Sequence, residues 1–115
     1  MATILSTNAI EESTYIITAT YTDQDGAAVT PNAGLNWTLT DDSGNIINDR
    51  DSVAIAVPST SNSVVLSGDD LAVPTTVNRV RIFTIEGTYN SATYGNNLPI
   101  KAQCQFTIDD LTAVT

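Results

Sequence analysis

Apolar side chains alternate with polar or small ones along several short stretches of this chain. The alternation runs through residues 15–21, 35–39 and 53–57, and it is longest over residues 98–108. A period of two is typical of a β-strand that buries one face. In the last stretch, one face carries six apolar residues: Leu98, Ile100, Ala102, Cys104, Phe106 and Ile108. A shift of one residue would turn all of them outward, so we expect this face to lie in the core.

Turn-forming residues separate these stretches. Asp, Asn, Gly, Ser and Pro cluster at residues 23–26, 31–34, 41–45 and 67–70, and the polar residues 90–97 predict a longer loop. Asp and Asn favour turns because their side chains bond to nearby backbone N–H groups. Helix-forming residues are scarce, and the one helical candidate is a single turn near residues 69–71. The pattern predicts one all-β domain over residues 1–115, an antiparallel β-sandwich of seven to eight short strands.

The segment over residues 77–89 does not alternate as simply as the others. Apolar residues fall on both faces of a strand there, and Arg81 shares a face with Phe83 and Ile85. Such a pattern indicates either a bulge that shifts the register or a strand covered on both sides. We favour coverage, with Arg79 and Arg81 near acidic residues of a neighbouring strand.

The composition limits the chemistry open to this chain. It has 115 residues and no histidine, which removes the usual general base near neutral pH. Its single cysteine, Cys104, excludes an intrachain disulfide and a zinc site built from cysteines. Thirteen acidic residues against four basic ones give a net charge of −9, so we expect no binding to nucleic acid or to an anionic membrane. Without a nucleotide-binding or hydrolytic motif, we expect neither an enzyme nor a cofactor.

Several segments resemble known immunoglobulin-like proteins. Residues 17–29 carry an Asp-x-x-Gly turn after a strand, and residues 35–39 carry an aromatic residue in the next strand, as in bacterial immunoglobulin-like domains. Residues 64–71 look like strand E of such domains and the turn that follows it. Residues 84–90 and 95–101 are similar to small immunoglobulin-like proteins encoded among the structural genes of tailed bacteriophages. The resemblance implies an immunoglobulin-like antiparallel β-sandwich.

The resemblance covers about residues 14–111 and implies a non-enzymatic structural protein of a phage virion. Such a protein would decorate or cement the capsid, or serve as an accessory of the neck or tail. Its partners would be phage structural proteins (the major capsid protein or neck and tail proteins), and it would form a homo-oligomer on the particle. It would be made in the host cytoplasm, consistent with the absence of a secretory signal pattern at the N-terminus. The alternative is a module of a bacterial cell-surface or adhesin protein, and a third is a carbohydrate-binding module.

Paired carboxylates are the first candidates for a functional site. Oxygen ligands from such pairs can bind Ca²⁺, and Asp23 and Asp25 are the pair we would select for it. The simpler explanation is a turn, because the pair lies at the end of a predicted strand without the spacing of a calcium loop. Cys104 is predicted to be an inert core residue, since it has an apolar strand face and no histidine partner.

Exposed apolar and aromatic residues are the candidates for contact with a partner. Tyr89 and Tyr94 flank the predicted polar loop, and Ile4 and Leu5 lie in an N-terminal segment that the sandwich does not require. We therefore expect residues 1–10 and 111–115 to act as arms. The N-terminal arm would either cover an edge of its own sheet or extend onto a neighbour.

Overall fold

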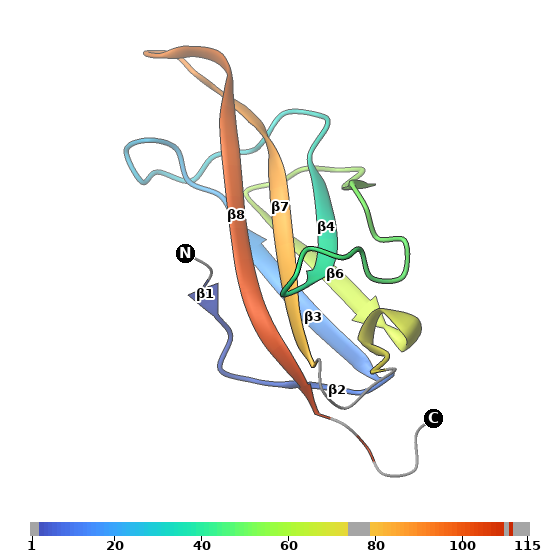
Figure 1. Cartoon of the computed structure of the whole chain (residues 1–115). Helices are drawn as coiled ribbons and strands as arrows, with labels where there is room; N and C mark the ends of the chain where they lie inside the picture. Colours follow the sequence, from blue (N-terminus) through green and yellow to red (C-terminus); the bar gives the residue numbers. More distant parts are fainter. Residues whose placement is uncertain (1–2, 74–78, 110, 112–115) are drawn as a thin grey trace.

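The computed structural model describes residues 3–73, 79–109 and 111, and these form a β-sandwich (Figure 1). The elements are β1 (Thr3–Ile4), β2 (Ala9–Ile10), β3 (Thr14–Thr20), β4 (Asn36–Asp41), β5 (Val53–Ala54), β6 (Ser61–Ser67), the 3₁₀ turn η1 (Gly68–Leu71), β7 (Val80–Ser91) and β8 (Gly95–Asp109). The predicted helical turn is confirmed as η1. The described residues contain no α-helix, as the scarcity of helix-forming residues predicted.

The strands form one large sheet and one small sheet. The large sheet has the order β1-β8-β7-β4-β5, with β2 also paired to β8, and the small sheet consists of β3 and β6. In the large sheet, β8, β7 and β4 are neighbours in that order, as strands G, F and C are in immunoglobulin sandwiches. The facing pair of β3 and β6 corresponds to strands B and E. The antiparallel expectation is correct for these five strands, but β1 and β2 run parallel to β8.

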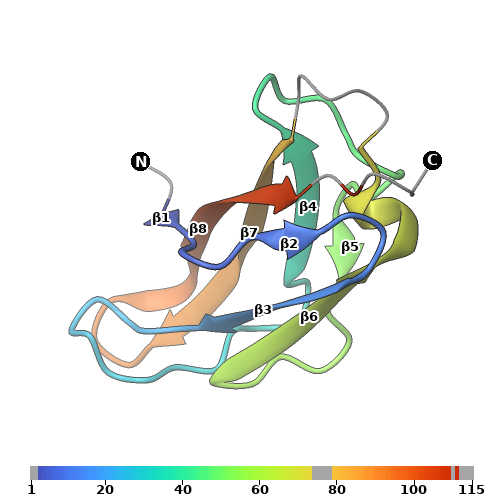
Figure 2. The ribbon, with the colours of Figure 1, turned by 90° about the horizontal axis from the view of Figure 1, so that it is seen from below.

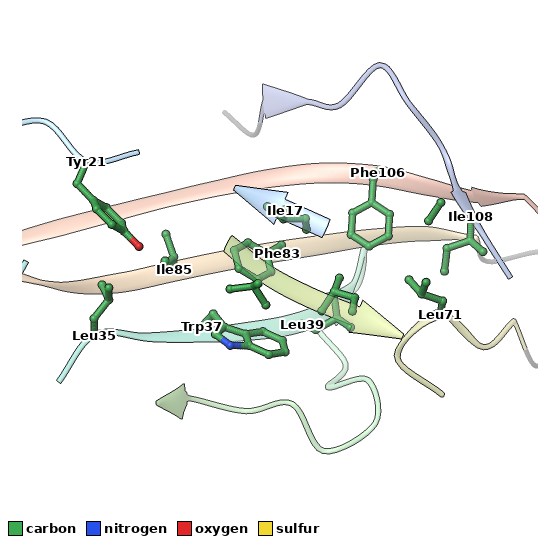
Figure 3. Close-up of a cluster of buried hydrophobic side chains, with 13 residues drawn as sticks. Ile17, Tyr21, Leu35, Trp37, Leu39, Leu71, Phe83, Ile85, Phe106 and Ile108 are labelled. Atoms are coloured by element: carbon green, nitrogen blue, oxygen red, sulfur yellow. The ribbon is translucent and has the colours of Figure 1, made fainter. Parts of the chain in front are cut away.

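The core lies between the two sheets (Figure 3). Trp37 is buried, as predicted, and its ring stacks on Phe83 of the adjacent strand with 5.4 Å between the ring centroids. Tyr15 packs against Phe106 in a tilted arrangement, with 4.8 Å between the ring centroids. The other buried apolar residues of the cluster are Ala9, Ile17, Tyr21, Leu35, Leu39, Val64, Leu66, Leu71, Ile85 and Ile108.

Both faces of β7 are covered, as we expected for a central strand. Its buried positions include Arg81, Phe83 and Ile85, and the residues between them are half-buried. Arg81 lies opposite Asp41 in the register of β4. Burial lowers the pKa of Arg81, while the charges of Asp41 and Asp42 act in the opposite direction. The expected proximity to acidic residues is therefore confirmed for Arg81.

The hairpin of β7 and β8 is longer than the sequence predicted. The prediction of a loop over residues 90–97 is wrong, because β7 continues to Ser91 and β8 begins at Gly95. Pairing between the two strands persists to Ser91 and Gly95, with an irregularity between Tyr89 and Ser91. The hairpin extends past the end of β4 and gives the molecule its length of 54 Å against a width of 24 Å (Figure 1).

The N-terminal arm covers an edge of its own sheet. Figure 2 shows β1 and β2 following one another alongside β8. Ala9 is buried at 1% exposure, and the carboxylate of Glu11 accepts a hydrogen bond from the Leu111 backbone N–H at 2.9 Å. Of the two alternatives that we expected for the arm, covering its own sheet or extending onto a neighbour, the structure therefore has the arm on its own sheet. In the expected C-terminal arm, residues 112–115 lie outside the described residues.

Candidate functional site

Three adjoining cavities run along one side of the sandwich: two lie between β3 and β8, and the third lies between β3 and residues 5–7 of the N-terminal arm. Their volumes are about 220, 240 and 300 Å³. The first two share Tyr21 and Ala102 in their walls, and the second and third share Leu5 and Ile17, so together they form one continuous groove. We call this groove the seam. Its lining residues are Leu5, Ser6, Thr7, Tyr15, Ile16, Ile17, Thr18, Ala19, Thr20, Tyr21, Thr22, Leu35, Phe83, Ile85, Ile100, Lys101, Ala102, Gln103 and Cys104.

The seam exists because the two sheets part along this side. The predicted core face of the last strand is confirmed for Phe106 and Ile108, which are fully buried. Further toward the hairpin, Cys104 is half-buried and Ala102 is exposed, and both line the seam. The prediction that this whole face lies in the core is therefore wrong for Ala102. The alternating pattern specifies the face, but it does not specify how far the opposite sheet extends over it.

A tyrosine hydroxyl in the seam lacks a hydrogen-bond partner. Tyr21 is only 4% exposed and lines two of the three cavities. Within the described residues its hydroxyl oxygen contacts no donor or acceptor. Burial raises the pKa of this phenol, so the group remains a protonated donor at neutral pH. The sequence predicts the burial of Tyr21 from its strand register, but not the unpaired hydroxyl.

The thiol of Cys104 lies in the wall of the same groove. Burial raises its pKa, which lowers the fraction of reactive thiolate at neutral pH. The residue is half-buried rather than enclosed in the core. Its geometry thus agrees with an unreactive thiol, while its location beside a cavity is new.

The residues predicted to contact a partner have different environments. Tyr94 is 64% exposed near the tip of the β7–β8 hairpin, and Ile4 is 72% exposed in β1. Leu5 is partly buried in the wall of the seam. The prediction for Tyr89 is wrong, because its ring is buried and its hydroxyl donates to Gln24 Oε1 at 3.0 Å.

Asp23 and Asp25 form a turn in the structure. The Asp23 carboxylate accepts backbone N–H groups of Asp25 and Ala27 at 2.9 and 3.0 Å, and the Gly26 N–H donates to its carbonyl. Asp25 accepts the side-chain amide of Gln24 at 3.1 Å. No group of three or more metal-ligating side chains occurs among the described residues. The geometry supports the turn rather than a calcium site.

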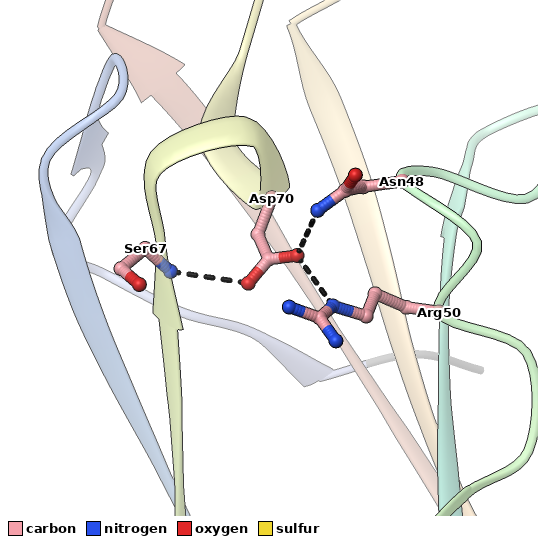
Figure 4. Close-up of polar contacts among 4 residues, drawn as sticks. All are labelled: Asn48, Arg50, Ser67 and Asp70. Carbon is pink, nitrogen blue, oxygen red and sulfur yellow. Dashed lines mark hydrogen bonds and ion pairs between the residues drawn. The ribbon is translucent and has the colours of Figure 1, made fainter.

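A buried carboxylate that sequence reasoning missed lies at the other end of the small sheet (Figure 4). Asp70 is 2% exposed and accepts from Arg50 Nε at 2.7 Å, Asn48 Nδ2 at 2.9 Å and the Ser67 backbone N–H at 3.2 Å. Burial alone would raise the pKa of Asp70, but these hydrogen bonds outweigh it and hold the pKa below its ordinary value. The cluster ties η1 to the loop before β5, so its role is structural.

The chain matches no protein-family model, no curated protein and no solved structure at significant similarity. In the described part of the chain, no helix is long and apolar enough to cross a membrane. The fold and the seam therefore define the chain only as a β-sandwich with an open groove along one side.

Proposed function

We propose that this chain is a non-enzymatic structural protein of a tailed-phage virion, attached to the capsid, the neck or the tail. One observation supports the proposal: two segments that resemble bacterial immunoglobulin-like domains lie on strands that are neighbours in the small sheet. Residues 17–29 contain the second half of β3 and the turn after it, and residues 64–71 contain the second half of β6 and η1. These strands pair with each other, as strands B and E do.

The shape of the molecule is suited to attachment by contact. The β7–β8 hairpin presents Tyr94 near its tip, and the arm presents Ile4 on the outer side of β8. A net charge of −9 keeps free copies apart in solution. Copies would then gather as a homo-oligomer on the particle, where a repeated lattice supplies many equivalent sites.

Purification of assembled particles tests the proposal directly. We expect the chain to band with density-purified virions and to be present in a fixed ratio to the major capsid or tail protein, measured by quantitative mass spectrometry. A fixed ratio that persists through a second gradient supports the proposal. Absence from particles, with recovery in the bacterial envelope fraction, overturns it and favours the cell-surface module.

A further inference from the structure

Both outer edges of the small sheet lack a partner strand among the described residues, and the edge of β3 is the one that borders the seam. β3 pairs with β6 on one side, and no described strand pairs with its other side. In immunoglobulin sandwiches this second position belongs to strand A, but here the N-terminal arm lies on β8 instead. The free edge over Thr14–Thr20 contains no charge and no proline. Natural sheets usually protect an exposed edge with such residues, so an unprotected edge invites a further strand.

The seam lies next to this free edge and has the chemistry of a strand-binding groove. The inward side chains of β3, including Ile17 and Ala19, form one wall, and residues 100–104 of β8 form the other. Lys101 is the only charged residue among the described residues that line it, although the chain carries 17 charged residues. A strand beside β3 would run about 23 Å, with every second side chain directed into the seam.

The Tyr21 hydroxyl supplies an independent sign of a missing ligand. A buried donor without a partner destabilises the folded state, and native structures rarely leave one unsatisfied. Tyr21 lines the two cavities nearest the hairpin, at the end of the seam that also contains Lys101. The hydroxyl oxygen itself has almost no accessible surface, so a backbone carbonyl of a strand in the seam would accept this hydrogen bond only after a small shift of the Tyr21 side chain.

We propose that the seam binds an extended, uncharged segment of a different protein, which adds as a strand to the free edge of β3. The segment would carry small apolar side chains on the face that enters the seam. A second copy fits less well, because its own β3 directs its apolar side chains into its own core. Two chains of charge −9 also repel each other. The inference deepens the proposed function and rests on it for the source of the segment, a neighbouring protein of the particle.

A blocked nine-residue peptide in which threonine and valine alternate is the probe. Added to the full-length protein, it should shift the backbone amide resonances of Thr14–Thr20 and slow their hydrogen exchange. The outer edge of β6 is the internal control and should not respond. A peptide of the same composition, with the valines and threonines in separate blocks, should not bind, because it cannot present one apolar face.

Two exposed alanines provide matched variants. Ala102 lines the seam and Ala54 lies in β5, away from it. Ala102→Arg should raise the dissociation constant of the peptide about tenfold or more, because the substitution places an unpaired charge in the groove. Ala54→Arg should leave it unchanged. Tyr21→Phe should weaken binding about fivefold while leaving the free protein as stable as before or more so, a combination that a purely structural tyrosine would not give.

Each outcome decides the inference. Loss of binding in Ala102→Arg but not in Ala54→Arg, with protection confined to β3, supports it. The absence of peptide binding, equal binding by both arginine variants, or protection at β6 overturns it. Protection of β3 by self-association without peptide makes a second copy the occupant and also overturns it. If the protein is present in purified particles but does not bind the peptide, this inference is wrong and the proposed function still stands.

Discussion

Trp37 lies in the core between the two sheets, and its removal should be costly. It is 6% exposed and stacks on Phe83. Trp37→Ala leaves a cavity and should lower the free energy of unfolding by about 3–5 kcal/mol, measured by urea denaturation. Val57→Ala is the control, since that side chain is 76% exposed, and it should change stability by less than about 0.5 kcal/mol. Equal effects of the two substitutions would contradict the burial of Trp37.

Cys104 should react slowly in the folded protein. Burial raises the pKa of its thiol and so reduces the thiolate available to an alkylating reagent. At pH 7 we expect iodoacetamide to label the native protein about tenfold more slowly than the urea-unfolded protein, and the difference should narrow as the pH rises. The chain has a single cysteine, so the modified fraction reports on this site alone. Equal rates in the two states would show that the groove leaves the thiol fully accessible.

Asp70 should make the stability of the fold depend on pH in the acid range. Its pKa is held below the ordinary value of about 3.9, so the stabilisation is present above that pH and is lost as the pH falls through the folded-state pKa. Asp70→Asn should cost about 2 kcal/mol at pH 7 and should reduce the loss of stability between pH 5 and pH 2, followed by thermal unfolding. The exposed neighbour Asp69 is the matched control. An Asp69→Asn variant with the same loss would contradict the assignment.

Sequence reasoning succeeded at residues whose environment follows from strand register. Trp37 and Phe106 are buried because period-two alternation places them on the inner face. The burial of Asp70 could not be predicted in the same way, since its hydrogen-bond donors Asn48 and Arg50 come from a loop some twenty residues earlier in the chain. The unpaired Tyr21 hydroxyl was missed for a related reason: local sequence does not reveal which groups reach a side chain from another sheet.

At the scale of elements, the N-terminal arm is the one most easily tested. It contributes the buried Ala9, and the Thr7 carbonyl accepts the Tyr15 hydroxyl at 2.6 Å. Deleting residues 1–10 should lower the free energy of unfolding by on the order of 2 kcal/mol, because burial and hydrogen bonds are both lost. The melting temperature would then fall by about 10 °C, measured by calorimetry. Ile4→Ser should have little effect, since that side chain is 72% exposed. An unchanged melting temperature after the deletion would mean that the arm does not stabilise the sandwich.

The sequence pattern did not predict how far the strands pair with one another. The polar residues 90–97 predicted a loop, yet most of them continue the β7–β8 ladder. A two-stranded projection has no core to face, so its side chains need not alternate between apolar and polar. The parallel pairing of β1 and β2 with β8 was equally hidden, because two-residue strands are too short to show a period.

The whole molecule combines a strongly acidic surface with uncharged surfaces at the seam and the free edge of β3. Its charge of −9 would oppose docking onto an acidic neighbour and favour docking onto a basic one. The outer face of the β3–β6 sheet, where Ile16 lies opposite Val65, is also free of charge. Attachment through such surfaces depends on the removal of apolar groups from water rather than on ion pairs.

This distribution of charge predicts how attachment responds to salt. The Debye length falls from about 10 Å at 0.1 M salt to about 3 Å at 1 M, so contacts between surface charges weaken strongly over that range. Because the seam contains only Lys101 as a charged group, we expect the affinity of the alternating peptide to change by less than about threefold between 0.1 and 1 M sodium chloride. Isothermal titration at several salt concentrations measures the change, and Lys101→Gln serves as the control that removes this charge. The blocked peptide carries no charge and cannot form an ion pair, so an affinity that falls more than tenfold at high salt would contradict binding through the burial of apolar groups.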